Sequence, residues 1–143
     1  MKAHSTDSGN FREYMDQFAL WSALTPQQRD TLAAHTRFVR YKKGTSVHRG
    51  SLGGAGTLHV ISGTLRVYTL SEEGREFTLY FLRDGDVALL ASTSFLGTIS
   101  CDIAIEATKN TELFVSDTET VRDILGANVE VRACAYAYAV ERL

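Results

Sequence analysis

The spacing of hydrophobic residues along this chain changes twice, from a helical period to a strand period and back. Over residues 11–24 large apolar side chains recur at helical spacing, which predicts one or two short helices. Thr25-Pro26-Gln27-Gln28 then supplies an N-cap residue, a proline at the first helical position and a glutamine at N3. This pattern predicts a further helix from Pro26 to His35.

From Arg37 onward the period becomes two, which is typical of strands with one buried face. Evenly placed turns separate the β-branched and aromatic runs, and this favours a jelly roll or barrel over a parallel sheet. The glycine-rich segment 50–56 lacks the lysine and following helix of a phosphate-binding loop, so it is predicted to be a flexible loop. The predicted strands cover residues 38–41, 57–61, 64–68, 76–81, 102–107 and 112–115.

Helical spacing returns after the last predicted strand. Ser116 and Glu119 predict a capping box for a helix that stops near Gly126. A second helix carries apolar residues at heptad spacing, a seam that packs along another helix. The seam residues are Val129, Ala133, Tyr136, Val140 and Leu143.

These patterns divide the chain into four expected segments: a disordered N-terminus (1–10), N-terminal helices (11–36), a β-roll (37–116) and C-terminal helices (117–143). The heptad seam still runs at the last residue, so we expect a longer native helix and interpret the chain as a fragment.

Composition narrows the functional classes. With 143 residues the chain is expected to form one domain with one core. Its 15 Lys and Arg against 17 Asp and Glu give a net charge of -2, without the basic excess that DNA binding needs. Neither a membrane-spanning apolar run nor a signal peptide is present in the sequence, which favours a cytoplasmic protein.

The order of helices, β-roll and helices resembles the N-terminal effector domain of the Crp/Fnr superfamily of transcription regulators. The resemblance rests on the stretch from Gly56 to Tyr68 (GTLHVISGTLRVY), the acidic turn from Ser71 to Leu79, Gly85-Asp86, Glu106-Ala107 and the closing helix. It implies a cyclic-nucleotide-binding-like jelly roll, a long helix that forms a homodimer, and DNA binding through a helix-turn-helix domain that this sequence does not contain. It also implies a sensor of a small effector and not an enzyme.

Family members that bind cyclic nucleotides carry Gly-Glu soon after the Gly-Asp turn and Arg-Ser or Arg-Thr before the next strand. Here those positions hold Leu89-Leu90 and Cys101-Asp102, and no arginine lies between Arg83 and Arg122. A buried phosphate without its arginine and beside a carboxylate costs on the order of several kcal/mol. We therefore expect no cAMP or cGMP binding in the usual way. A genuine cyclic-nucleotide site with an altered cassette is the alternative.

The segment between Leu89 and Cys101 mixes hydroxyl and apolar side chains. It either forms a pocket for a small, mostly apolar effector of unknown identity or packs against the roll as a short helix and loop. The candidate ligand-binding residues, placed by analogy with the cassette, are Gly85, Asp86, Leu89, Leu90, Ser92, Cys101 and Asp102.

No metal or cofactor is predicted. The two cysteines, Cys101 and Cys134, are too few for an iron–sulfur cluster. Cys101 is either a redox-sensing thiol or an inert buried one. The second alternative function, a cupin that binds a metal or a small molecule, predicts a His-x-His pair and a later histidine, yet no histidine follows His59. Haem needs one or two axial ligands, and the residues formally available for this role are Met15, His48, His59 and Cys101. We do not expect haem, because His59 alternates with core residues and His48 lies in a turn-rich stretch.

Overall fold

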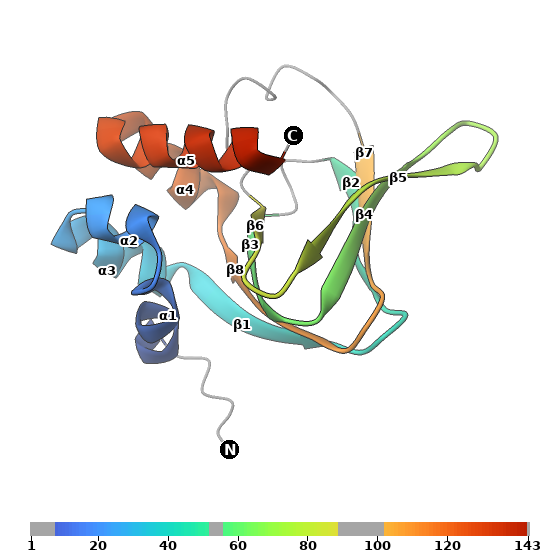
Figure 1. Ribbon diagram of the computed structural model, residues 1–143, viewed down its shortest axis with the longest axis horizontal. Coiled ribbons are helices and arrows are strands. Elements are labelled where there is room, and N and C mark those ends of the chain that lie inside the picture. The colour runs from blue at the N-terminus through green and yellow to red at the C-terminus, as the bar shows by residue number, and fades with distance from the viewer. Residues whose placement is uncertain (1–7, 52–55, 89–101, 143) are drawn as a thin grey trace.

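In the computed structural model, which describes residues 8–51, 56–88 and 102–142, short helices precede two antiparallel sheets and two further helices follow them (Figure 1). The helices are α1 (Ser8–Met15), α2 (Ala19–Ala23), α3 (Pro26–Ala34), α4 (Thr118–Ala127) and α5 (Val129–Arg142). The strands are β1 (Thr36–Tyr41), β2 (Ser46–Ser51), β3 (Thr57–Ser62), β4 (Thr64–Leu70), β5 (Glu76–Arg83), β6 (Val87–Ala88), β7 (Asp102–Ala107) and β8 (Thr111–Ser116).

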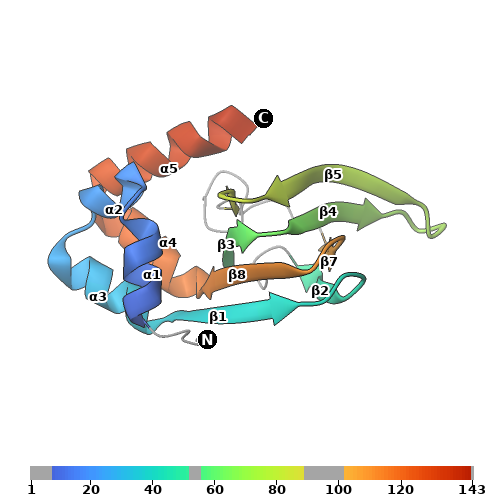
Figure 2. The same cartoon turned by 60° about the horizontal axis from the view of Figure 1, so that its bottom comes forward.

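The strands form two layers, with orders β1-β8-β3-β6 and β2-β7-β4-β5 (Figure 2). The chain passes from one layer to the other between β3 and β4, at Gly63. Its φ of +110° lies in the region that glycine favours, and an added Cβ would lie 2.6 Å from the Asn110 carbonyl oxygen. The jelly-roll prediction is confirmed.

The period of two along the strands produces a core between the two layers. Leu65 pairs with Leu82 and Ala107, and Val67 pairs with Tyr80 and Ile105, so their side chains share one face. We call this set the roll core. It consists of Leu58, Val60, Leu65, Val67, Leu82, Ile103, Ile105, Ala107, Leu113 and Val115.

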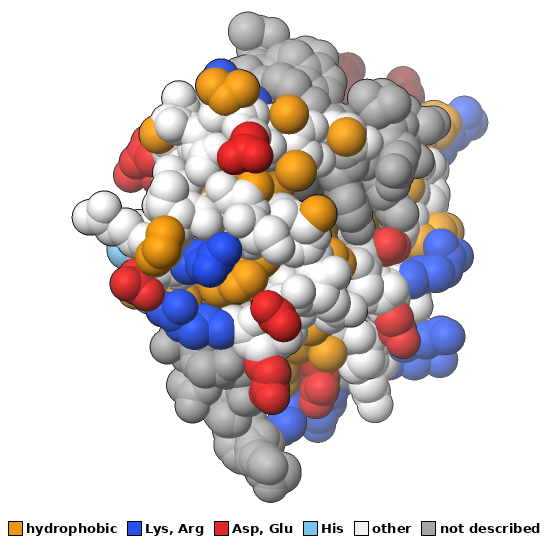
Figure 3. All heavy atoms as spheres, turned by 60° about the vertical axis from the view of Figure 1, so that its left-hand side comes forward, with side chains coloured by type: hydrophobic (Ala, Val, Ile, Leu, Met, Phe, Trp, Pro, Cys, Tyr) orange, Lys and Arg blue, Asp and Glu red, His pale blue; other side chains and the backbone are white. Residues whose placement is uncertain are grey.

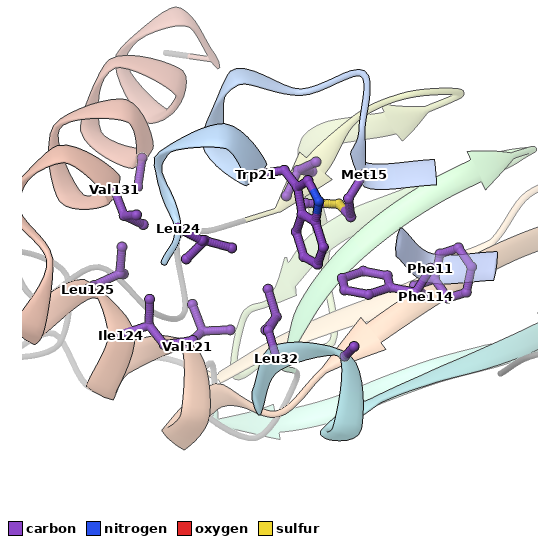
Figure 4. Packing of buried hydrophobic residues seen from close by; sticks show 13 residues of the cluster. Phe11, Met15, Trp21, Leu24, Leu32, Phe114, Val121, Ile124, Leu125 and Val131 are labelled. Atoms are coloured by element: carbon purple, nitrogen blue, oxygen red, sulfur yellow. The ribbon is translucent and has the colours of Figure 1, made fainter. Parts of the chain in front are cut away.

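A second core, the cap core, lies between the helices and the outer face of the β1-β8-β3-β6 sheet (Figures 1 and 4). Its aromatic centre is Phe11, whose ring meets those of Trp21 and Phe114 edge-on at centroid distances of 5.6 and 5.2 Å. The predicted capping box starts α3 here: Gln28 N donates to Thr25 Oγ1, and Thr25 N donates to Gln28 Oε1. The cap core consists of Phe11, Met15, Trp21, Leu24, Leu32, Ala33, Val87, Phe114, Val121, Ile124, Leu125, Val131 and Ala135.

Two predictions near the strand ends are wrong. Gly50 and Ser51 belong to β2, where they pair with Ile103 and Asp102, and are not part of a loop. The cap of α4 is Asp117 and not Ser116: pairing of β8 with β1 continues to Ser116, which is fully buried, so the helix begins one residue later than expected.

The Asp117 side chain caps the first turn of α4. Asp117 Oδ2 accepts hydrogen bonds from Thr120 N and Oγ1, and these hydrogen bonds keep the pKa of Asp117 below its usual value.

The C-terminal end of α4 also differs slightly from expectation. Gly126 lies inside α4, which ends at Ala127. Within the described ranges no helix is long and apolar enough to cross a membrane.

Candidate functional site

The predicted Gly85-Asp86 turn joins β5 to β6 and holds both against β3. Gly85 has a φ of +85°. Its N–H donates to the Val60 carbonyl at 2.8 Å, and Val60 N–H donates to the Asp86 carbonyl at 2.9 Å. Asp86 Oδ2 accepts from Arg83 N at 2.7 Å. The turn residues therefore fix the strand that leads into the cassette-equivalent segment.

The other residues of that candidate site are placed only in part. Leu89, Leu90, Ser92 and Cys101 lie outside the described residues. Asp102 is the first residue of β7 and pairs with Ser51 of β2. The described contacts do not bring Asp102 together with the Gly85-Asp86 turn.

Charged side chains of the β2-β7-β4-β5 sheet gather on its outer face. Arg66 Nη2 lies 2.7 Å from Glu76 Oε1, and Arg66 Nη1 lies 2.7 Å from Glu106 Oε1. The hydrogen bond with Glu76 is the main cause of a raised pKa at Arg66. The guanidinium stacks on the ring of Tyr68 at 4.0 Å, and Arg49 Nη2 reaches the Tyr68 hydroxyl at 3.5 Å.

A chain of polar groups crosses the sheet that faces the helices. His59 Nε2 lies 3.2 Å from Ser116 Oγ, which lies 2.8 Å from Thr36 Oγ1. Thr36 Oγ1 donates to the Leu32 carbonyl at 2.7 Å. His59 is 2% exposed, its Nδ1 has no hydrogen-bond partner among the described residues, and burial lowers its pKa to about 4. The imidazole is therefore neutral and packed against Phe11, 5.5 Å away.

The helix α5 has two different faces. Val131 and Ala135 are buried in the cap core, at 2% and 0% exposure. Val129, the first seam residue, is 69% exposed, and Ala133, the second, is also exposed. Tyr136 and Val140 follow on the same helix, and Leu143 lies outside the described residues. Val129 and Ala133 thus lie on the face of α5 that the cap core leaves open.

The described side chains offer little for a metal or haem. No group of three or more His, Cys, Asp or Glu that would suit a metal ion occurs among them. Met15 and His59 are both buried in the packed cap core, and Met15 is fully enclosed. His48 lies in β2, contrary to the turn-rich environment expected for it. Cys134 is a half-buried free thiol on α5.

The surface over the helical end carries interspersed acidic and basic side chains with small hydrophobic areas between them (Figure 3). No single-sign field covers this face. This distribution agrees with the near-neutral charge of the chain and differs from the basic stripe of a DNA-binding surface.

The fold defines the class of protein: a cyclic-nucleotide-binding-like β-roll flanked by helices. A Crp/Fnr-family chain from Eubacterium rectale, described as a transcriptional regulator, is 34% identical with a TM-score of 0.77; the match covers 91% of this chain and 59% of that one. The sensor domain of the transcriptional regulator DNR from Pseudomonas aeruginosa is 20% identical, with a TM-score of 0.72, over 95% of this chain and 90% of that domain.

The catabolite activator protein of Thermus thermophilus is 24% identical with a TM-score of 0.59, and the match covers 86% of this chain and 56% of that protein. No protein-family model and no curated protein sequence matches the chain. The structural neighbours nevertheless confirm the resemblance: the chain has the fold of the N-terminal cyclic-nucleotide-binding-like domain of Crp/Fnr regulators, and it spans 59% of the Eubacterium rectale protein.

Sequence reasoning missed the sorting of charges between the two faces of the sheet and the polar chain that starts at His59. The first has a sequence signal, because Arg66 alternates with Leu65 and Val67. The second joins residues of β1, β3 and β8 that lie far apart in the sequence. No local pattern signals it.

Proposed function

We propose that the chain is the effector-sensing and dimerisation part of a Crp/Fnr-type transcription regulator. The observation that carries this proposal is the 34% identity to the Eubacterium rectale regulator across 91% of the chain. DNA would be bound through a separate helix-turn-helix domain, because the charge of this part is near neutral. Such a regulator acts in the cytoplasm.

Signalling would work by population shift. An effector that binds one arrangement of β-roll and α5 more tightly than the other shifts the equilibrium toward that arrangement. Two features support α5 as the transmitting element: Val131 and Ala135 attach it to the cap core, and Val129 and Ala133 face outward. A second copy of α5 packing on the outward face would then sense any rotation of the helix.

We further propose that the cassette-equivalent site does not bind cAMP in the usual way. The residue types at its discriminating positions support this: Leu89-Leu90 in place of Gly-Glu and Cys101-Asp102 in place of Arg-Ser. The nearest described arginine before this segment, Arg83, lies with its guanidinium 5.1 Å from the centre of the Phe81 ring.

The dimer is tested by sedimentation velocity over a range of protein concentrations. Ala133→Glu places a charge in the seam, where burial against a second copy is costly, and we expect the variant to sediment as a monomer. Ala34→Glu is the matched control, because Ala34 is exposed on α3, away from the seam, and should leave the dimer intact. A parent protein that remains monomeric at high concentration, or an Ala133→Glu variant that still dimerises, would contradict the proposal.

A further inference from the structure

We propose that a pocket on the outer face of the β1-β8-β3-β6 sheet binds a small organic cation, a quaternary ammonium group, in place of the Arg40 guanidinium. The pocket has a volume of about 370 Å³, and its lining comes from α1, β1, β3 and β8. It lies beside α1, which stands over the helical end of β1 and β8 (Figure 2). This site is separate from the cassette-equivalent segment and does not depend on the sensor function proposed above.

Strand register places the pocket outside the roll. Phe38 pairs with Phe114, and Arg40 pairs with Glu112 two residues further along the same ladder, so these four side chains share one face of the sheet. The intervening Leu113 belongs to the roll core on the opposite face. A molecule in this pocket therefore binds against the outer surface of the sheet and not inside the roll.

Aromatic rings surround the pocket. The Phe114 ring lies at centroid distances of 5.6 Å from Tyr14 and 5.7 Å from Phe38. Phe114 is 3% exposed, whereas Tyr14 and Phe38 are only half-buried and keep part of their surface open. The Tyr14 hydroxyl donates to the Val60 carbonyl at 3.1 Å, which fixes the orientation of its ring. Grouped aromatic rings favour alkylated ammonium groups, because the face of each ring carries partial negative charge.

The charged side chains of the pocket also favour a cation. Glu13, Glu112 and Arg40 line it, so the carboxylates outnumber the guanidinium. Glu112 Oε2 lies 3.0 Å from Arg40 Nε, whereas Glu13 is exposed and forms no ion pair with another described residue. A primary ammonium group is strongly hydrated. A quaternary ammonium group has no N–H to hydrate, so it loses less on entering an aromatic site.

Arg40 already places a cation on one of these rings. Its Cζ lies 5.4 Å from the centre of the Phe38 ring. The Arg40 side chain is 56% exposed, and its partner Glu112 is 40% exposed, so solvent weakens the ion pair that holds it there. Arg40 is therefore an internal occupant with which a ligand cation competes. Its removal should strengthen binding, whereas removal of an ordinary ligand-binding arginine weakens it.

The test compares choline with dimethylbutanol, its neutral isostere, in which a tert-butyl group replaces the trimethylammonium group. Each probe is titrated into the 143-residue chain at pH 7 and fixed ionic strength, and NMR shifts of the Tyr14 and Phe38 ring protons report binding. We expect choline to bind at least about threefold more tightly, which corresponds to about 0.7 kcal/mol. Equal binding of the two probes, or no shift of either ring with choline in the tens of millimolar, would overturn the proposal.

Arg40→Met tests the competition. The methionine keeps an apolar stem and removes the guanidinium, and we expect the preference for choline over dimethylbutanol to rise at least about twofold. Arg83→Met is the matched control. Arg83 Cζ lies 5.1 Å from the centre of the Phe81 ring, a similar contact that does not line this pocket, so the parent preference should remain. An unchanged or reduced preference in Arg40→Met would contradict the proposal.

Phe38→Leu tests the ring. The leucine keeps the site apolar, so dimethylbutanol should still bind while the preference for choline falls to the level of the isostere. Phe81→Leu is the control and should keep the parent preference, because Phe81 does not line the pocket. A Phe38→Leu variant that prefers choline as strongly as the parent would refute the role of this ring. The Arg40→Met result tests the site even where Phe38→Leu does not fold, because Arg40 is exposed.

Discussion

The cap core and the roll core are both apolar but differ in composition. The cap core is built around aromatic rings that meet edge-on, with Phe11 in contact with Trp21 and Phe114 (Figure 4). The Phe11 ring also meets the His59 ring, at a centroid distance of 5.5 Å. The roll core is aliphatic. Partly buried side chains border both cores, for example Tyr80 beside the roll core and Phe38 beside the cap core. The hydrogen-bonded chain that starts at His59 lies on the cap-core side of its sheet. The ion pairs of Arg66 lie on the outer face of the other sheet, away from the roll core.

The two cores therefore differ in how strictly their side chains fix the packing around them. Edge-to-face rings and the hydrogen bonds of Ser116 and Thr36 permit few alternative packings, so the cap core fixes how α1 and α3 sit on the sheet. Aliphatic side chains lack such directional contacts between rings. We therefore expect a large-to-small mutation at the aromatic centre of the cap core to cost more stability than one at an exposed position of the sheets.

The largest expected effect is that of Phe11→Ala. Phe11 is 1% exposed, and its removal leaves a cavity between three rings, so we expect the free energy of unfolding to fall by about 3–5 kcal/mol. Urea denaturation followed by circular dichroism measures this loss. Phe77→Ala is the matched control: Phe77 is 50% exposed, and its loss should be far smaller. If both variants lose the same free energy of unfolding, the edge-on ring packing around Phe11 does not stabilise the cap core in particular.

Elements of the two cores that depend on neighbouring residues could be predicted from the sequence, and elements that depend on distant strands could not. Local patterns were sufficient for the Thr25 cap and for the strands β3, β4 and β5, which are runs rich in β-branched and aromatic residues. The strand β2 has the sequence SVHRGS, with one β-branched residue, and it exists because β7 pairs with it. Tertiary pairing overrode a weak local preference there.

The resemblance to the family was predictable from the sequence, and the arrangement of the site was less so. Leu89-Leu90 and Cys101-Asp102 stand where the resemblance requires Gly-Glu and Arg-Ser, which is visible in the sequence alone. The burial of His59 was not predictable, because it depends on Phe11 and Ser116, which are 48 and 57 positions away. The residues next to His59 in the sequence do not indicate its contact with Phe11 or with Ser116.

The next effect concerns the pH dependence of the cap core. The pKa of His59 is lowered from 6.5 to about 4 in the folded chain, so between these values the unfolded chain binds a proton that the folded chain does not. The stabilising effect of the neutral imidazole is fully present above pH 6.5 and is lost as the pH falls toward 4. In total this amounts to about 3 kcal/mol.

Urea unfolding at several pH values between 7 and 4 measures this loss. His59→Leu should flatten the curve, because the leucine takes up no proton in the unfolded state, while Ser116 keeps its bond to Thr36. His35→Gln is the control, since His35 is exposed, and it should follow the parent curve. A His59→Leu variant as pH-dependent as the parent would show that other groups cause the acid sensitivity.

The smallest effect compares ion pairs on the outer faces of the two sheets. Arg40 and Glu112 lie 3.0 Å apart, but their side chains are 56% and 40% exposed. Solvent screens such a pair, so Glu112→Gln should lower the free energy of unfolding by at most about 0.5–1 kcal/mol. Glu106→Gln removes a partner of Arg66, whose side chain is 19% exposed and bound from two sides, so this variant should lose more free energy of unfolding.

Urea denaturation at low and high salt distinguishes the two variants, because salt screening abolishes the smaller contribution first. If Glu112→Gln costs as much as Glu106→Gln, the charges of the outer β2-β7-β4-β5 face are no better organised than those of an ordinary surface.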